Sequence, residues 1–517
     1  MPPSDPSHQH EGEPRPQESF QLWQLFGMMT AAQGTPIVIG SFLSLIVGVG
    51  GPPGYIWGGF TAGIFSILIM LSLAEICCVY PCPAGQVYWS GVLFRRGANR
   101  PASYACGWIC TFGWHLWFGG VTILIAEYIC AVAKIYHPAH IFDQWQIYLV
   151  NIAIIVLSLL WNGLLFKAFT KLTPVIIYTF NVGALFIFIA LLVKATPKQS
   201  ARTVFIDLLN ETGWSNDGAV FLIATGPLTA CLTAFDTAAH LADEVPNPSR
   251  TITIVMVFST LINYGTGLAM SIAQMFCTTN LNHFLNPVGK QPLIQLFHDS
   301  LATDWLIITS CVIVIIAQIF CAICALTIAG RTLWAFANLN GTPYPAWLGQ
   351  LDPRYALPMN AMYILTIATI AITAVSMGSR TALNAILNGG SICIFISYAF
   401  PITQLLVVGR KFLPADRHLN LGTFGLICNA VSALWIPFAV IMPCFPLYLP
   451  AMPNTMNYTS VIVGGIVIFG VINWVMNSRK IYVIPEWTAG SATAASAPGN
   501  STECADMARK RSEAETL

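Results

Sequence analysis

Several stretches of this chain run for the length of a membrane-spanning helix without one charged side chain. Crossing about 30 Å of hydrocarbon takes about 20 apolar residues in a helix. Five stretches meet this length, and each predicts one span: those between Asp143 and Lys167, Lys171 and Lys194, Asp304 and Arg331, Arg354 and Arg380, and Arg380 and Arg410. The whole chain is 56% hydrophobic and only 9% charged, which is far from the composition of a soluble domain. These features predict an all-α polytopic membrane protein.

Two longer uncharged runs are too long for one helix and are interrupted by turn-forming residues. The run from Glu18 to Glu75 contains a Gly- and Pro-rich cluster at 50–54, and the run from Arg417 to Arg479 contains several prolines at 443–453. Because such clusters favour turns, each run predicts a helical hairpin. Three further spans are expected at 104–132, 217–241 and 252–277, which brings the total to about twelve.

The charges indicate how the spans are oriented. The 23 basic and 22 acidic residues leave a net charge of only +1. The chain therefore lacks the positive electrostatic field that nucleic-acid binding requires. With the N-terminus inside, the cytosolic loops hold eleven basic residues (Arg95, Arg96, Arg100, Lys167, Lys171, Arg250, Arg331, Arg354, Arg410, Lys411, Arg417) and the outer loops six (Lys134, Lys194, Lys198, Arg202, Lys290, Arg380). This bias predicts that both termini are cytosolic. The glycosylation motifs at Asn210 and Asn457 would then lie outside.

Two of the expected spans contain helix-breaking residues in corresponding positions. The first carries Gly34, Thr35 and Pro36, and the sixth carries a break predicted at 225–227. Thr233, Phe235 and Asp236 follow that second break. Solute carriers bind their substrates at interrupted helices because freed backbone groups become ligands there. We therefore expect a substrate and coupling site formed by these six residues, the alternative being ordinary kinks that Gly and Pro produce in many membrane helices.

A carboxylate such as Asp236 is costly inside a membrane. Either it pairs with a cation or binds a proton, or it is permanently hydrogen-bonded to the broken helix. His115 and Glu127 in the third span are further candidates, although a buried neutral histidine and an acid near the outer end have simple structural roles as well. The cysteines lie mostly in apolar stretches, where a thiol behaves as a small hydrophobe. We expect no metal and no cofactor.

Three motifs resemble the amino acid–polyamine–organocation permeases, in particular the branch of fungal amino acid and choline transporters. One is the segment that follows Asp236, from Thr237 to Arg250, and it includes His240, Glu244 and Pro248. Another comprises Ser72–Ile76 with the following Tyr80, Pro81, Gly85, Gln86, Tyr88 and Trp89. The third comprises Arg331–Phe336 with Gly341, Pro343, Pro353, Pro358 and Asn360. The motifs follow one another in the order of the family, and the resemblance extends from about Phe20 to Arg479, nearly the whole chain. The chain departs from these relatives at 34–36, where they tend to have Asn-Ser-Trp, and at 338–340, where Arg-Asp-Gly is usual.

The resemblance implies a leucine-transporter-type fold of about 12 transmembrane helices. Its permease domain would cover 20–479, with inverted repeats at 22–193 and 217–408, peripheral spans at 422–476, and cytosolic tails at 1–19 and 480–517. The stretch from Gly85 to Phe94 would form a short interfacial helix, with Tyr88 and Trp89 at headgroup depth.

The resemblance also implies a secondary active transporter of an amino acid or a related small amine, coupled to protons and working by alternating access. A choline, polyamine or other organocation carrier is the alternative, and a transporter-like nutrient sensor is another. A membrane enzyme would need clustered catalytic ligands, which the sequence does not offer. We expect a multi-pass protein of the plasma membrane rather than the vacuolar membrane.

Overall fold

A computed structural model describes residues 20–484 except 47, 96, 286, 288, 290, 379 and 453–455. The expected tail at 1–19, and all but the first five residues of the tail expected at 480–517, lie outside the described residues. Ten helices in the described chain are long and apolar enough to cross a membrane. Two further crossings are built from interrupted helices, so the expectation of about twelve spans is confirmed.

The long helices follow one another with short connections. They are α4 (Gly51–Val79), α6 (Asn99–Tyr136), α7 (Gln144–Gly163), α8 (Phe166–Lys194), α11 (Pro248–Phe276), α14 (Asp304–Asn338), α16 (Met359–Thr373), α17 (Arg380–Val408), α18 (Gly422–Ile441) and α19 (Thr459–Asn473). The first interrupted crossing consists of α1 (Leu22–Gln33), α2 (Thr35–Val38), the 3-10 turn η1 (Ile39–Phe42) and α3 (Leu43–Ile46). The second consists of α10 (Asp217–Cys231) and the 3-10 turn η2 (Ala239–Glu244).

Short elements connect the spans. They are α5 (Gln86–Leu93), α9 (Ala201–Phe205), α12 (Leu281–Leu285), α13 (Pro292–Ser300), α15 (Pro345–Leu348), α20 (Arg479–Ile481), the 3-10 turns η4 (Ala374–Met377), η5 (Arg410–Phe412) and η6 (Met442–Cys444), and the π-helical turn η7 (Trp474–Ser478). Strands β1 (Val49–Gly50) and β2 (Leu209–Asn210) pair antiparallel, with Val49 opposite Asn210.

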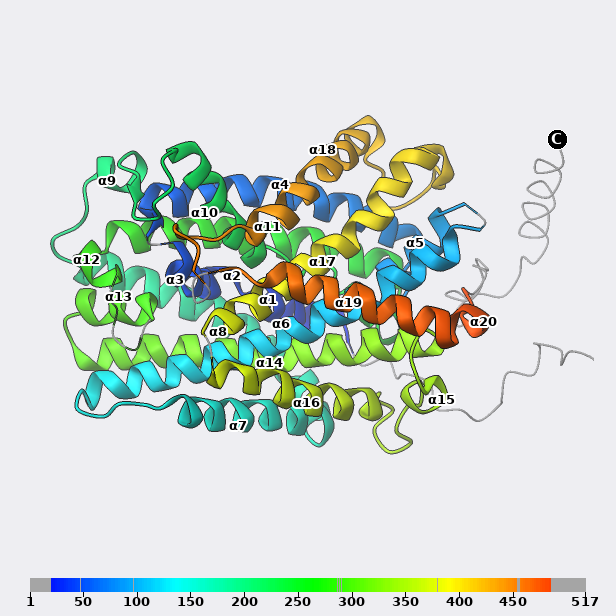
Figure 1. Cartoon of the computed structure of the whole chain (residues 1–517), viewed down its shortest axis with the longest axis horizontal. Coiled ribbons are helices and arrows are strands. Elements are labelled where there is room, and N and C mark those ends of the chain that lie inside the picture. The colour runs from blue at the N-terminus through cyan, green and yellow to red at the C-terminus, as the bar shows by residue number, and fades with distance from the viewer. Residues whose placement is uncertain are drawn as a thin grey trace, which may run out of the picture.

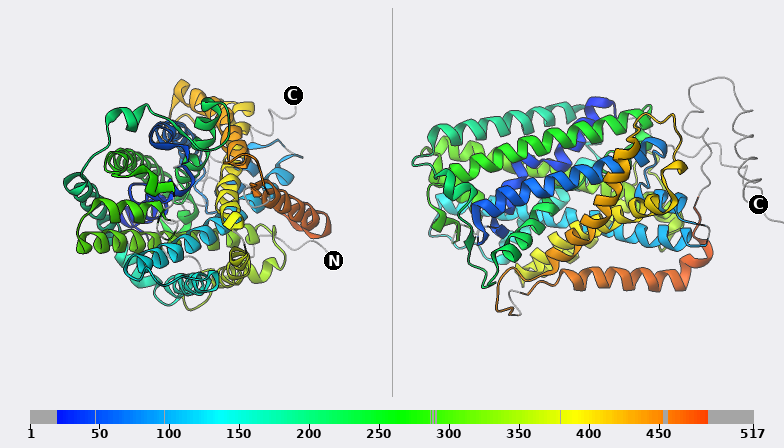
Figure 2. Two further views of the ribbon diagram at one scale, coloured as in Figure 1. Left: turned by 60° about the vertical axis from the view of Figure 1, so that its left-hand side comes forward. Right: turned by 90° about the horizontal axis from the view of Figure 1, so that it is seen from above.

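The spans run along the long axis of the molecule and give it two distinct ends (Figure 1). Helices α5, α15 and α20 lie at one end, which we call the α5 end, and α9, α12 and α13 lie at the other, the α9 end. Helix α19 lies along the outer edge of the bundle (Figure 2). The described chain begins and finishes at the α5 end, as an even number of spans requires.

Two local expectations need correction. Helix α4 already begins at Gly51, so Pro52 and Pro53 occupy its first turn and the chain reverses just before them. Proline is tolerated there because the first N–H groups of a helix have no intrahelical partner. Helix α5 forms as expected, but Tyr88 and Trp89 are buried in the protein and do not face headgroups. The indole of Trp89 donates to the backbone carbonyl of Tyr80 at 2.7 Å.

Candidate functional site

The first crossing is interrupted at a single residue, Gly34. Its φ of 49° and ψ of 19° are left-handed, and its N–H closes α1 by donating to the carbonyl of Thr30 at 2.7 Å. A Cβ at this position would lie 2.8 Å from the ring of Phe180 and 2.9 Å from a methyl of Val38. Glycine is therefore required here both by backbone conformation and by space.

The residues on either side of Gly34 carry buried polar atoms without partners. Gln33 donates from Nε2 to Thr260 at 2.8 Å, whereas its Oε1 and the Oγ1 of Thr35 make no hydrogen bond to any described residue. Pro36 stands in the first turn of α2, where a missing N–H has no consequence for the helix. The interruption thus comes from Gly34, and Pro36 favours the restart of the helix beyond it.

The second crossing breaks further along the chain than the sequence predicted. Pro227, expected to mark the break with Thr225 and Gly226, lies inside α10, which continues to Cys231. The non-helical segment is 232–238, where Ala234 has a positive φ of 66° and Thr237 donates from Oγ1 to the carbonyl of Ala234 at 2.8 Å. Hydroxyl and carboxylate side chains in this segment compete with the helical hydrogen bonds, which is why the chain unwinds there.

Asp236 is fully buried in this unwound segment and accepts hydrogen bonds from other spans. Tyr398 of α17 donates to Oδ1 at 2.5 Å. Gln86 of α5 donates to Oδ2 at 2.5 Å, and Trp114 of α6 donates to the same oxygen at 3.4 Å. Asp236 therefore joins three elements to the break in the second crossing.

His240 completes the surroundings of Asp236. Its Nε2 lies 3.0 Å from Oδ2 of Asp236, and its Nδ1 lies 2.8 Å from the carbonyl oxygen of Pro83. Cys110, Asp236 and His240 hold their ligand-type atoms within 4.8 Å of one another, and all three are buried. Such a group could hold a metal ion by composition, but the carboxylate already has four hydrogen-bonding neighbours.

The other two predicted residues of this segment lie beside the carboxylate. Phe235 stacks on Tyr398, with ring centroids 4.9 Å apart. Thr233 is buried close to the Tyr398 hydroxyl, yet its Oγ1 makes no hydrogen bond to a described residue. The structure therefore brings Thr233, Phe235 and Asp236 together around Tyr398 of α17.

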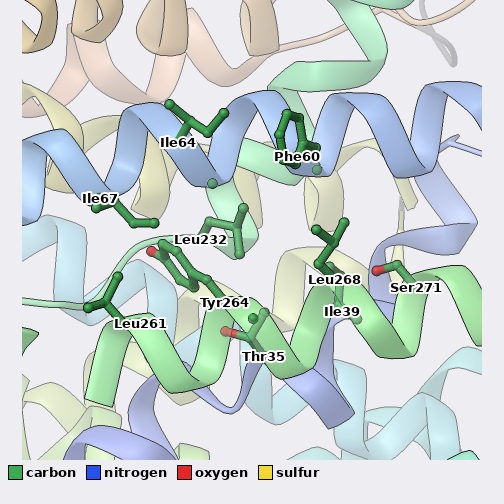
Figure 3. A pocket seen from close by; sticks show the side chains of 13 residues that line it. Thr35, Ile39, Phe60, Ile64, Ile67, Leu232, Leu261, Tyr264, Leu268 and Ser271 are labelled. Carbon is green, nitrogen blue, oxygen red and sulfur yellow. The ribbon is translucent and has the colours of Figure 1, made fainter. Parts of the chain in front are cut away.

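A cavity of about 190 Å³ lies beside the two breaks (Figure 3). Thr35 and Leu232 reach it from the interrupted crossings, and α4 and α11 form its walls. Its lining comes from spans one, two, six and seven and includes Phe60, Ile64, Leu261, Tyr264 and Leu268. Phe60, Ile64 and Leu261 are exposed on the outer surface of the bundle. This mainly apolar cavity is thus separate from the cluster around Asp236.

Contacts at the α5 end tie the two interrupted crossings to each other and to α14. Arg331 of α14 donates to Glu244 from Nε at 2.5 Å and from Nη2 at 3.1 Å. The guanidinium also lies over the ring of Phe166, 5.3 Å from its centroid. Phe20, at the start of the first crossing, donates its N–H to the carbonyl of Glu244 at 3.1 Å. This end of the bundle is therefore closed by contacts among spans one, five, six and eight.

A second buried carboxylate at the same end holds the loop after α17. Glu75 of α4 accepts from Nε and Nη2 of Arg417 at 2.9 and 2.7 Å and from the backbone N–H of Leu421 at 3.1 Å. Arg410 donates to its other oxygen. Since Glu75 is fully buried, these bonds compensate its desolvation.

The remaining predicted residues lie apart from the breaks. His115 is buried between α6 and α16, with Nε2 3.0 Å from Oγ1 of Thr369. Glu127 lies nearer the α9 end and accepts from Nε2 of Gln291 at 2.6 Å. Asn210 and Asn457 belong to connections outside the long helices, and their side-chain amides donate to Trp214 and to Phe445, respectively.

Sequence reasoning did not select Gln86, Tyr398 or His240 as site residues. His240 stands four positions after Asp236, a spacing that could have suggested a pair. Gln86 and Tyr398 lie 150 and 162 positions away from Asp236, and nothing in their local sequence indicates the contact.

Twelve crossings, two of them interrupted next to buried polar groups, define an α-helical membrane carrier. The family model described as amino acid permease matches residues 20–469, and the chain belongs to this family. It is 27% identical to a choline transporter of Saccharomyces cerevisiae, over 91% of this chain and 83% of that protein. An uncharacterized amino-acid permease of Schizosaccharomyces pombe is 26% identical over 90% of this chain and 86% of its own length. An amino-acid permease of Oryza sativa is 24% identical, over 84% and 86% of the two chains.

Proposed function

We propose that this permease carries an amino acid or a related small amine, which binds between the two interrupted crossings. The observation that carries the proposal is the set of buried polar atoms left without partners at the breaks: Oε1 of Gln33, Oγ1 of Thr35 and Oγ1 of Thr233. Buried polar groups are normally hydrogen-bonded, so unpaired ones at a helix break are natural ligands for a polar solute. The carbonyl groups at the ends of α1 and α10 are suited to an ammonium group.

An organocation such as choline is the second candidate. Trp114, Phe235 and Tyr398 surround Asp236 with aromatic rings, and aromatic faces bind quaternary ammonium groups. A relative carries the name choline transporter. In this conformation the carboxylate is occupied by protein donors, so a cation would have to displace one of them.

We further propose that the protein resides in the plasma membrane with its α5 end facing the cytosol. We also propose that its transport is coupled to protons. The excess of basic residues in the loops of that end supports this orientation. Ties from Glu244 to Arg331 and from Glu75 to Arg410 and Arg417 would then close the cytosolic side. A buried ionisable site at the break, which contains the carboxylate of Asp236, supplies a differential affinity for protons if its surroundings change between the two conformations, as coupling requires.

Reconstitution tests substrate and coupling together. The purified chain in proteoliposomes is offered labelled amino acids, 4-aminobutyrate, choline and polyamines, with and without an inward proton gradient. We expect concentrative uptake of one class, stimulated by the gradient. Uptake of choline alone would select the organocation alternative, and failure of every compound would point to a sensor.

Asp236→Asn is the matching variant because it keeps the shape of the side chain and removes the carboxylate. We expect a folded protein whose uptake no longer responds to the gradient. Full uptake with unchanged pH dependence would assign Asp236 a permanent structural role.

A further inference from the structure

We propose that the proton of the Asp236–His240 pair resides on His240, which makes this histidine the proton-binding residue of the transporter. This inference rests on the proposed proton coupling and names the residue that carries it. The atoms around the pair that can only donate, or only accept, hydrogen bonds locate this proton.

The contact with Pro83 fixes the tautomer of His240. Its Nδ1 lies 2.8 Å from the carbonyl oxygen of Pro83, which has no hydrogen to give. Nδ1 must therefore carry the hydrogen of this contact. In a neutral imidazole the other nitrogen, Nε2, then has a bare lone pair.

The bare nitrogen Nε2 would face another hydrogen-bond acceptor, the carboxylate of Asp236. Nε2 lies 3.0 Å from Oδ2, and a carboxylate oxygen is also an acceptor. Two acceptors at this distance repel each other unless a hydrogen lies between them. The pair as it stands therefore contains one proton more than a neutral histidine beside a carboxylate.

The other hydrogen-bonding partners of Asp236 show which of the two residues holds that proton. Oδ2 already receives hydrogens from Gln86 and Trp114, both of which can only donate through the atoms concerned, and Oδ1 receives one from Tyr398. The Sγ of Cys110 faces Oε1 of Gln86 at 3.9 Å, which supports this orientation of the amide. Since donors surround the carboxyl group on all sides, the ionised form is favoured, and the proton lies on Nε2.

Among the described residues, the other groups that face the pair supply no competing positive charge. Cys110 faces it from α6 and Tyr398 from α17, Cys77 of α4 is close enough to interact with Asp236, and α5 contributes the uncharged Gln86. His240 is thus the cation that neutralises Asp236 in this closed conformation.

This assignment connects proton release to movement at the α5 end. When the N–H bond of Nε2 breaks and the proton passes to water, the bare nitrogen faces the carboxylate and the contact becomes repulsive. Asp236 is bonded to α5 and α17, so loss of the His240 contact weakens the closure of the unwound segment against both helices. Rebinding of a proton restores it.

Infrared difference spectroscopy of the purified full chain at varied pH tests the assignment directly. With ¹⁵N-labelled histidine, we expect an imidazolium signal that shifts with the label and is absent in His240→Gln. The signal should persist in His115→Gln, the matched control, because His115 contacts Thr369 and, among the described residues, no carboxylate. A protonated-carboxyl band that disappears in Asp236→Asn would instead place the proton on Asp236 and overturn the proposal.

Transport provides a second measurement, using whichever labelled compound of the panel the wild type takes up. In His240→Gln and His240→Arg, the ratio of uptake with and without a proton gradient should fall to about one, while exchange of labelled for unlabelled compound continues. His240→Arg keeps a donor and a positive charge beside Asp236, so it serves if the glutamine variant does not fold. Wild-type gradient stimulation in both variants would contradict the proposal. A wild type that ignores the gradient would refute proton coupling and leave the infrared assignment intact.

Discussion

Arg331 donates hydrogen bonds to Glu244 from two nitrogens, Nε at 2.5 Å and Nη2 at 3.1 Å. This ion pair connects α14 to the end of the second interrupted crossing. The arginine side chain is only 2% exposed and that of Glu244 9%. Removing one member of a buried pair leaves the other charge without compensation, at a cost of about 3–5 kcal/mol.

Glu244→Gln should therefore lower the thermal stability of the purified protein and weaken closure of the α5 end. We expect faster labelling of single cysteines introduced near Phe166 by a membrane-impermeant reagent from that side. The reversed pair, Glu244→Arg with Arg331→Glu, should recover part of both losses. Equal behaviour of single and double variants would show that the two residues do not act through each other.

Gly34→Ala should impair transport more than Pro36→Ala. A non-glycine residue in the left-handed region costs about 1–2 kcal/mol, equivalent to about 5- to 30-fold in a conformational equilibrium. The added methyl would also press on Phe180. Pro36→Ala adds an N–H at a helix start, where it has little effect.

Uptake and melting temperature measured on both variants test this order, with Gly464→Ala as the control. A Cβ at Gly464 meets no atom of the described chain within 4 Å. Should Pro36→Ala prove the more damaging change, the interruption depends on the proline after all.

Glu75→Gln should destabilise the protein strongly, because Arg410 and Arg417 would lose the charge that both share. The loss is again about 3–5 kcal/mol for a buried pair. Lys411→Gln is the control, since Lys411 is exposed beside the same site. Heat-induced aggregation followed by size-exclusion chromatography would report the difference, and similar midpoints for both variants would contradict the expectation.

Chelators should leave transport unchanged although Cys110, Asp236 and His240 have the composition of a metal site. The carboxylate of Asp236 already has four hydrogen-bonding partners: Tyr398, Gln86, Trp114 and His240. A metal ion would therefore have to replace hydrogen bonds already formed. Cys110→Ala should likewise retain uptake. Inactivation by a chelator, reversed by one particular metal, would show that the group binds that ion.

The sequence by itself determined the membrane architecture, since the absence of charge over the length of a span is a local property. It also located the first break, because Gly34 alone provides the left-handed residue that the interruption needs. The second break was predicted at 225–227, at least five residues before the segment 232–238 where the chain unwinds. Pro227 suggested the earlier position, but it lies inside α10, which continues past it to Cys231. At 232–238, tertiary contacts to Asp236 hold the unwound segment in place.

Only the tertiary structure decided what surrounds Asp236. Its partners come from α5, α6 and α17, and no local pattern relates Gln86 or Tyr398 to a carboxylate in another span. The pairing of Glu244 with Arg331 was hidden for the same reason, because both residues belong to motifs that are far apart in the chain. Hydrophobic length is encoded in consecutive residues, but hydrogen-bond partners of a buried charge are set by how the helices pack.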